Sequence, residues 1–311
     1  MNLKQLEYFV RVAELGSFSK AAMVLNIAQP ALSRHVRLLE TDLRTTLLIR
    51  NGRGVMMTEA GKRLYDHAVG ILQLMSSVRE DIEANRDVPS GRIVVGLPPS
   101  FGRWCTLPLV EEFRENLPQA QLSIVEGLSA HLAEWIASGR ADLAILLNPD
   151  PNPALDIQPV IDESICLVGT RDNMKAIGAG ASGVAFAELA HLPLIVPGRT
   201  HAIRKLIETQ SALLGMPLEV AWEISSIASI LNLVQAGYGY ALLPRSAVAV
   251  SGLSSHFVLA PIVAPTLISR LCLVCSSHKQ PTPLIRHVQR VLRQLIISGA
   301  EAMESPHNKT L

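Results

Sequence analysis

Apolar residues recur every three or four positions through the first part of the chain, and this spacing predicts a group of short helices. The first helix has Leu6 and Phe9 on its apolar stripe and should end at Gly16. A second helix should follow, capped by Ser17 or Ser19. These segments are too short to be stable alone, so they should pack together as one small domain.

A third helix should begin near Gln29-Pro30, because proline is tolerated in the first helical turn. A face separate from its buried stripe carries Gln29, Ser33 and Arg37, with Pro30 and Arg34 beside them. Two short helices with Gln, Ser and Arg displayed on the second suit insertion into a DNA major groove, where these side chains pair with base edges or phosphates. The alternative is an ordinary solvated face of a helical bundle.

A β-hairpin is predicted next, with strands at Thr46–Arg50 and Val55–Met57 around the turn Asn51–Gly54. Asn-Gly is a strong hairpin signal because both turn positions favour positive φ. Arg50 and Arg53 flank the tip, where a basic wing would contact phosphates or a minor groove. A structural hairpin that is basic by chance is the alternative.

A long amphipathic helix should begin after Thr58. Its apolar residues alternate in steps of four and three, which is the heptad pattern of a helix paired along one seam: Leu64, Ala68, Ile71, Met75, Val78 and Ile82. The pattern favours pairing with a second copy of the chain, although packing on its own domain is the alternative. Residues 85–91 indicate a linker.

Beyond residue 91, strands alternate with helices, which is typical of an α/β domain with mostly parallel sheets, either one unit or two lobes. The expected strands are Ile93–Leu97, Gln121–Glu126, Asp142–Leu147, Ile165–Thr170, Leu194–Val196, Tyr240–Leu243 and Arg270–Ser276. The expected helices are Leu107–Asn116 (opening at Pro108), His131–Ser138, Ala202–Leu214, Ser226–Ala236 and Thr282–Ile297. Residues 301–311 should form a disordered tail.

Charge divides the chain unevenly, although the whole carries a formal charge of only +1. Residues 1–63 hold ten Lys and Arg against five Asp and Glu, a charge of +5, and the remainder is at −4. A basic head on an acidic body suggests a polyanionic partner for the head alone. With no signal peptide and no charge-free apolar stretch long enough to cross a bilayer, we expect a cytoplasmic protein with no membrane partner.

No catalytic or metal-binding constellation is recognisable. Cys272 and Cys275 have C-x-x-C spacing, but they fall in one strand, where residues three apart point to opposite faces. We therefore expect no enzyme activity, no metal and no cofactor.

The head resembles the N-terminal signature of LysR-type transcriptional regulators. Matching motifs follow one another in order over about sixty residues: Leu6-Glu7-Tyr8-Phe9, Gly16-Ser17-Phe18-Ser19-Lys20-Ala21-Ala22, Gln29-Pro30-Ala31-Leu32-Ser33, Leu38-Leu39-Glu40, Leu48-Ile49-Arg50 and Thr58-Glu59-Ala60-Gly61. The resemblance implies DNA contacts by Ser19, Gln29, Pro30, Ser33, Arg34 and Arg37, with Arg50 and Arg53 on the backbone. Ala28 departs from the family, which often has a capping Ser there, so the cap of the third helix is in doubt.

The resemblance also implies an α/β effector domain of two lobes, like a periplasmic binding protein, behind a winged helix-turn-helix and a helical linker. The predicted units are 1–58 (winged helix-turn-helix), 59–88 (dimerisation helix) and 91–300 (effector domain). Lobe I would comprise 91–162 and 267–300, and lobe II 163–266, with chain crossings near Asp162–Ser164 and Ala264–Ser269. Related regulators dimerise through the linker helix and usually form tetramers.

A ligand in such a fold lies between the lobes, facing strand ends and helix N-termini, so we expect a small anion. Arg103 or Arg199 would pair with it. The candidate effector-binding residues are Pro98, Ser100, Phe101, Gly127, Leu128, Ser129, Asn148, Pro197, Arg199, Thr200 and Ser226. Plain helix capping is the alternative role for the Ser and Thr residues.

Together these features predict a transcriptional regulator, expected to act as an activator, that binds double-stranded DNA with dyad symmetry as a dimer or tetramer and works with RNA polymerase. Its small-molecule effector and its target operon stay unidentified. A regulator of the same type that acts without an effector is the alternative. A transport-type solute-binding protein leaves the basic head unexplained, and an α/β enzyme lacks catalytic residues.

Overall fold

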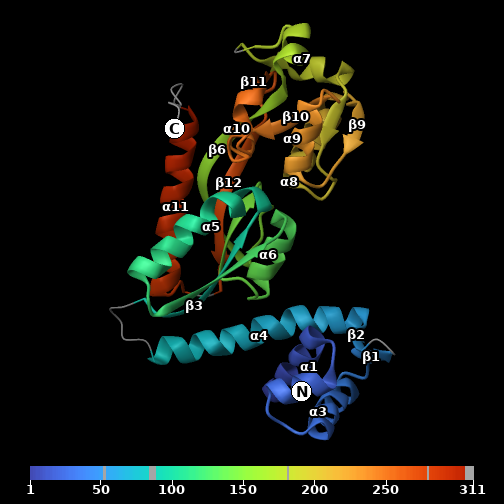
Figure 1. Cartoon of the computed structure of the whole chain (residues 1–311), viewed down its shortest axis with the longest axis vertical. Helices are drawn as coiled ribbons and strands as arrows, with labels where there is room; N and C mark the ends of the chain where they lie inside the picture. Colours follow the sequence, from blue (N-terminus) through green and yellow to red (C-terminus); the bar gives the residue numbers. More distant parts are fainter. Residues whose placement is uncertain (52–53, 84–88, 181, 279, 305–311) are drawn as a thin grey trace.

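The computed structural model describes residues 1–51, 54–83, 89–180, 182–278 and 280–304 of the chain. The molecule is elongated: a small helical head, a long helix lying across it, and two α/β lobes stacked beyond that helix (Figure 1). No helix in these ranges is long and apolar enough to cross a membrane.

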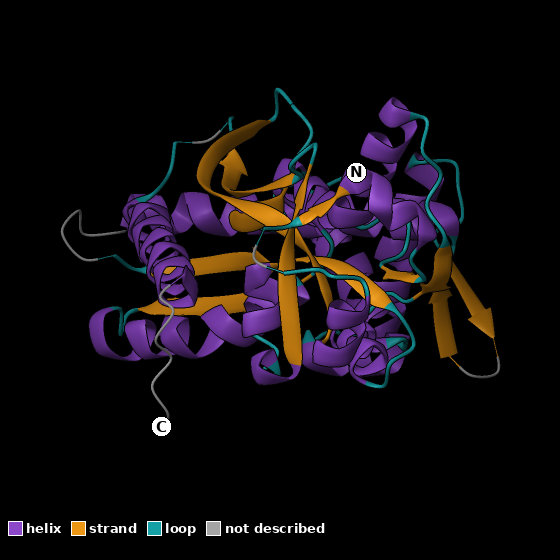
Figure 2. Cartoon of the chain, turned by 90° about the horizontal axis from the view of Figure 1, so that it is seen from above, coloured by secondary structure: helices purple, strands orange, loops and turns teal. Residues whose placement is uncertain are grey.

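Three helices and a hairpin make up the head: α1 (Leu3–Leu15), α2 (Phe18–Val24), α3 (Gln29–Asp42), β1 (Leu48–Asn51) and β2 (Gly54–Met57). The apolar stripes expected from the sequence meet in one core, with Phe9, Leu32 and Leu39 fully buried. Ser17 caps α2 by accepting a hydrogen bond from the amide of Lys20. The hairpin projects from the edge of the molecule (Figure 2).

Helix α4 (Glu59–Glu83) has two differently used halves. In the first half Ala68 is fully buried against the head core and Leu64 packs beside it. In the second half Ile71, Met75 and Val78 are exposed. The predicted seam is thus split, because its first two positions cover the head of the same chain. The side chain of Ile82, the sixth predicted position, lies outside the described part.

The lobes share one path of hydrogen-bonded strands in the order β4-β3-β5-β12-β6-β10-β8-β9. Lobe I contains β3 (Gly91–Leu97), α5 (Pro99–Asn116), β4 (Ala120–Glu126), α6 (Ser129–Ala137), β5 (Leu143–Leu147), β12 (Ile268–Ser276) and α11 (Pro283–Glu304). Helices α5 and α11 cover one face of its sheet and α6 covers the other.

Lobe II contains α7 (Arg171–Ala176), β7 (Val184–Ala185), η1 (Phe186–His191), β8 (Leu194–Val196), α8 (Ala202–Leu214), β9 (Val220–Glu223), α9 (Ile227–Gln235), β10 (Tyr240–Pro244), α10 (Arg245–Ala249), η2 (Ser254–His256) and β11 (Phe257–Val263). Its core is separate from the core of lobe I. Each lobe therefore packs as a unit of its own.

The two lobes are joined by β6 (Leu155–Thr170) and by the passage from β11 to β12. Strand β6 pairs with β12 in lobe I and with β10 and β11 in lobe II, always antiparallel. The sheets are consequently mixed, whereas the sequence led us to expect mostly parallel ones. Strand β6 therefore belongs to the sheets of both lobes and connects them.

Several predicted boundaries were wrong. The helix expected at Leu107–Asn116 begins at Pro99 and carries Pro108 inside it. The closing helix does not stop at Ile297 but continues to Glu304, so residues 301–304 of the predicted tail are helical. Residues 305–311 of that tail lie outside the described part. Strand β6 begins at Leu155, ten residues before the predicted start at Ile165.

Candidate nucleic-acid interface and interlobe cavity

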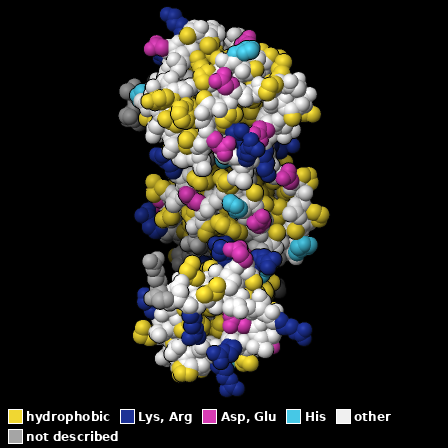
Figure 3. Space-filling model, turned by 90° about the vertical axis from the view of Figure 1, so that its right-hand side faces the viewer, with side chains coloured by type: hydrophobic (Ala, Val, Ile, Leu, Met, Phe, Trp, Pro, Cys, Tyr) yellow, Lys and Arg dark blue, Asp and Glu magenta, His cyan; other side chains and the backbone are white. Residues whose placement is uncertain are grey.

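Helix α3 is packed into the head by one face and presents the other to solvent. Leu32, Val36 and Leu39 are buried, whereas the polar face is open. On that face Gln29, Pro30, Arg34 and Arg37 are exposed and Ser33 is half-buried; Ser19, at the start of α2, is also exposed. Several Lys and Arg side chains lie on this end of the molecule, and others lie on the lobes (Figure 3).

The start of α3 has no side-chain cap. Ala28 occupies the N-cap position and makes no side-chain hydrogen bond, as the departure from the family pattern led us to expect, and a proline follows in the first turn. Pro30 has no amide proton and the Ala31 amide donates to the Ala28 carbonyl at 3.0 Å, so the Gln29 amide is the first-turn donor that remains for an outside partner such as a phosphate.

The wing is tied to α3 through Arg50. Its Nη2 donates a hydrogen bond of 2.7 Å to the Ser33 hydroxyl, and its guanidinium carbon lies 4.1 Å from the centre of the Phe18 ring. Two candidate DNA contacts thus hold each other in place without DNA. Arg53, the second candidate in the wing, lies outside the described residues.

Backbone contacts fix the wing against the rest of the head. The amides of Leu47 and Leu48 donate to the Glu40 carboxylate at 2.8 and 3.2 Å, and the Val55 amide donates to the Gly16 carbonyl at 2.9 Å. The wing and α3 therefore form one rigid surface, which is what readout of a groove and its flanking phosphates requires.

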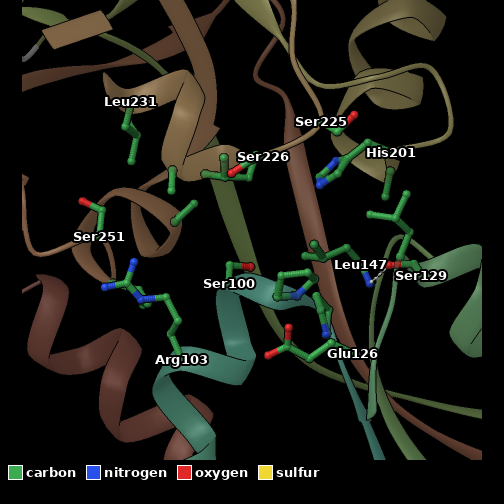
Figure 4. A pocket seen from close by; sticks show the side chains of 18 residues that line it. Ser100, Arg103, Glu126, Ser129, Leu147, His201, Ser225, Ser226, Leu231 and Ser251 are labelled. Atoms are coloured by element: carbon green, nitrogen blue, oxygen red, sulfur yellow. Dashed lines mark hydrogen bonds between the residues drawn. The ribbon is translucent and has the colours of Figure 1, made fainter. Parts of the chain in front are cut away.

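A cavity of about 450 Å³ opens between the lobes (Figure 4). Lobe I contributes the first turns of α5 and α6, and lobe II contributes the first turns of α8 and α9 together with α10 and the residues after it. Its size lies within the range of small-molecule sites. Apolar side chains form much of its wall, including Pro98, Pro99, Leu147, Ile227 and Leu231.

The candidate effector residues are divided by the structure. The cavity wall includes Pro98, Ser100, Leu128, Ser129 and Ser226, and Phe101 lines a small adjoining space. The remaining candidates do not line either: Gly127, Asn148, Pro197, Arg199 and Thr200. As effector contacts, all of them stay predictions.

Several of the candidates that do not line the cavity have other contacts or positions in the fold. Asn148 holds the lobes' crossing strand, since its Oδ1 accepts from the Arg270 amide at 2.7 Å and its Nδ2 donates to Ser269. Pro197 is buried, and its carbonyl accepts from Arg204 at 3.4 Å. Arg199 and Thr200 are exposed outside the cavity.

Sequence reasoning missed residues that the fold brings to the cavity. Glu126 ends β4, and His201 precedes α8. Helix α10 and the turn after it, which the sequence pattern did not reveal, supply Ala247, Val250 and Ser251. The sequence offered one signal for Glu126: it is an acidic residue at the end of the predicted strand β4, and side chains at the ends of strands face such clefts.

His201 presents a fixed donor to the cavity. Its Nδ1 accepts a hydrogen bond from the Ile203 amide at 3.2 Å, so in the neutral ring the proton is on Nε2. Burial lowers the pKa of His201 from its ordinary value of 6.5, so the ring is neutral at pH 7. The side chain is therefore a hydrogen-bond donor there and carries no charge.

Helix α4 touches lobe I directly. Arg140 pairs with Asp66 of α4 at 3.0 Å, and its guanidinium lies 4.3 Å from the centre of the Trp135 ring. Gly70 lies so close to the loop after α6 that a Cβ there would stand 1.8 Å from the Ser138 carbonyl oxygen. The head and the effector domain thus meet through one tight helical contact.

The four cysteines are free thiols buried in the two lobes: Cys105, Cys166, Cys272 and Cys275. Cys272 and Cys275 belong to the cores on opposite faces of the lobe I sheet, as their spacing in one strand predicts. Burial raises the pKa of the Cys105 thiol to about 12.

Comparisons with known proteins cover nearly the whole chain. Residues 3–62 match the model "Bacterial regulatory helix-turn-helix protein, lysR family", and residues 86–296 match "LysR substrate binding domain". The nitrogen assimilation regulatory protein nac of Klebsiella aerogenes is 32% identical over 297 residues, which span 95% of each chain.

Solved structures give the same picture of the fold. A full-length OxyR variant from Pseudomonas aeruginosa has a TM-score of 0.70 at 24% identity, covering 95% of this chain and 94% of that one. Full-length CbnR, crystallised with its target DNA, has a TM-score of 0.64 at 22% identity, covering 95% of this chain and 100% of that one.

Proposed function

The chain belongs to the LysR family of DNA-binding transcriptional regulators, and on that premise we propose that it binds an operator of dyad symmetry as a dimer or higher oligomer and responds to a small carboxylate-bearing effector. In this proposal it acts without cofactor or catalysis, and the bound oligomer works on RNA polymerase at a metabolic operon. One observation carries the DNA half of the proposal: the exposed polar face of α3, braced by Arg50.

Contacts of α3 with DNA divide into two kinds. Gln29 and Ser33 have hydrogen-bonding groups that suit base edges, and Arg34 and Arg37 suit guanine or phosphate. These side chains lie within nine consecutive residues of one helix, a length that fits a single major groove. A solvated face with no partner would have no need for the brace between Ser33 and Arg50.

The exposed second half of α4 supports oligomerisation. Ile71, Leu74, Met75 and Val78 are each 38–44% exposed; Leu74 and Met75 are adjacent, and each lies three or four residues from Ile71 and from Val78, so all four share one side of the helix. Such a stripe on a long helix is unfavourable in water and is covered when a second copy pairs along it. Two heads would then read the two half-sites of one operator.

Control by an effector fits a cavity whose walls come from two lobes. A ligand that touches both lobes stabilises one angle between them, and it shifts an existing equilibrium by its difference in affinity for the two states. Lobe I contacts α4 through Arg140 and Gly70, so a change of lobe angle reaches the helix that spaces the heads. If the protein acts without an effector, changes in the cavity will leave regulation unaltered.

Footprinting with the full-length protein on its own promoter region tests the proposal. We expect protection of a site with dyad symmetry that survives excess scrambled DNA. Arg34→Ala should weaken it, whereas Lys4→Ala, an equal loss of charge at an exposed position of α1, should leave sequence preference unchanged. Equal binding to operator and scrambled DNA would overturn the proposal.

A further inference from the structure

The interlobe cavity contains two opposite charges that do not neutralise each other. Arg103 extends from α5 and Glu126 from the end of β4, and both line the cavity. Both side chains are exposed, and neither has a hydrogen bond or an ion pair with any residue in the described part of the chain. In Figure 4 Arg103 reaches up towards Ser251, while the Glu126 carboxylate lies on the other side of the Ser100 backbone.

The position of the Glu126 side chain depends on the glycine at position 102, which has no side chain of its own. A Cβ at Gly102 would stand 2.1 Å from the Glu126 Oε1, so glycine at this buried position lets the carboxylate rest against the first turn of α5. That turn also carries Ser100 and Arg103. Arg103 therefore belongs to the same part of α5 against which the Glu126 carboxylate of β4 rests. A ligand with a single charge would pair with one of these two side chains and leave the other without a partner.

Neutral groups complete the site. The Ser100 and Ser225 hydroxyls line the cavity and have no hydrogen-bond partner among the described residues, and His201 offers its Nε2 proton from lobe II. The rest of the wall is mostly apolar, from Pro98 and Leu147 in lobe I to Ile227 and Leu231 in lobe II. A guest therefore needs a small polar end and an apolar body.

We propose that the effector is a zwitterion with an apolar side chain, of the class of the apolar α-amino acids, whose carboxylate pairs with Arg103 and whose ammonium group pairs with Glu126. This inference rests on the proposed function and refines it, because a simple carboxylate would meet repulsion from Glu126. Both pairs are charge-assisted, and because Arg103 and Glu126 are exposed in the open cavity, water screens each of them in part.

Binding of matched probes to the full-length protein tests this inference. Leucine, methionine and phenylalanine are each compared with the acid that lacks the amino group and with the amine that lacks the carboxylate: 4-methylpentanoate and 3-methylbutylamine for leucine, and the corresponding pairs for the others. Thermal shift identifies binders and calorimetry gives Kd. We expect at least one amino acid to bind about 10-fold or more tightly than its acid and its amine.

Variants assign the two charges. Glu126→Gln should abolish the preference for the amino acid over its acid, and Arg103→Gln should abolish the preference over its amine. Gly102→Ala keeps both charges but displaces the Glu126 carboxylate, so it should weaken amino-acid binding while circular dichroism shows an intact fold. Glu111→Gln on α5 and Arg171→Gln on α7, both exposed outside the cavity, are the matched controls and should bind as the unaltered protein does.

Two results would overturn the zwitterion: no amino acid binds, or an amino acid and its acid bind equally well. Operator footprints of the same preparations separate this failure from failure of the proposed function. Protection that persists while the amino acids fail leaves the regulator intact and removes only the effector class, whereas loss of operator preference in the unaltered protein removes the function itself.

Discussion

The head and the effector domain build their candidate sites in opposite ways. The DNA-facing residues of α3 come from nine consecutive positions of one helix. The interlobe cavity takes its residues from the ends of many elements between Pro98 and Ser251. A helical site is a property of local periodicity, whereas the cavity exists only after two lobes have closed around it.

The largest effect should follow from changing α3, since a single element carries the whole site. Arg34→Ala should cost about 1–3 kcal/mol of specific binding, which corresponds to roughly 5- to 150-fold in Kd. Ser33→Ala removes a hydroxyl that we propose contacts a base, and it also releases Arg50. Titration of a labelled operator against scrambled competitor measures both.

Salt dependence distinguishes two roles of Arg34, which are contact with a base and contact with a phosphate. If Arg34 reads a base, its loss lowers specificity and changes the salt slope little; if it only holds a phosphate, binding falls equally on all sequences and the slope drops by about one. The second result would show that α3 positions the head without reading sequence through Arg34.

The same contrast explains how much the sequence revealed. The boundaries of α8 at Ala202–Leu214 and of β8 at Leu194–Val196 follow from periodicity alone and agree with the structure. The first two turns of α5 were missed because the helix was predicted to open at Pro108. In fact Pro99 occupies the first turn, where proline is tolerated, and Pro108 is accommodated inside a long packed helix.

Cavity residues were harder to predict for a similar physical reason. Ser100 and Ser129 could be found because each follows the predicted end of a strand by three residues. Glu126 and His201 face the cavity only because the turns around them fold back, and α10 is five residues long, too short to show a period. Apart from the place of Glu126 at the end of a strand, nothing local distinguishes such positions from an ordinary exposed acid or helix cap.

A smaller effect should follow from separating the two regions at α4. Gly70→Ala places a methyl group against the Ser138 carbonyl, and because the neighbour is backbone, the helix or the loop must move. Overpacking costs about 1–3 kcal/mol, partly offset by the better helix propensity of alanine, so we expect a net loss of about 1–2 kcal/mol in denaturant unfolding.

Gly180→Ala is the matched control, since nothing lies within 4 Å of a Cβ there. We also expect Gly70→Ala to retain operator binding, because the head core does not include Gly70, while effector-dependent changes in the footprint shrink. A variant as stable as the unaltered protein would mean that α4 is not held against lobe I in solution, and that the head and the effector domain are independent of each other.

A pH-dependent effect of moderate size is expected in the effector domain from His201. Its pKa is lowered in the folded state by burial, so the unfolded chain takes up a proton first as the pH falls. Stability should therefore decline as the pH drops below about 6.5 and be unaffected by this group above it.

His201→Asn isolates this effect. Asparagine can keep the N-cap of α8 but does not titrate, so Tm should fall less between pH 7.5 and 5.5 than in the unaltered protein. The lowered pKa of Glu112, whose main cause is its hydrogen bond with His287, contributes in a separate window below its ordinary value of 4.5. Parallel curves for the two proteins would show that His201 is not desolvated in solution.

The smallest effect should be seen at Cys105, which reports on whether lobe I stays closed. With a pKa of about 12, about one thiol in ten thousand is ionised at pH 8, and the side chain is fully buried. Iodoacetamide should therefore label Cys105 in the folded protein far more slowly than in urea, as followed by mass spectrometry. Cys105 follows Phe101 by one turn of α5, and Phe101 borders the cavity. If Cys105 in the folded protein is labelled nearly as fast as in urea while operator binding is retained, the flexible part of the molecule lies in lobe I. The head would then be the more rigid of the two regions, and the interlobe cavity of the effector domain would be the part that opens and closes.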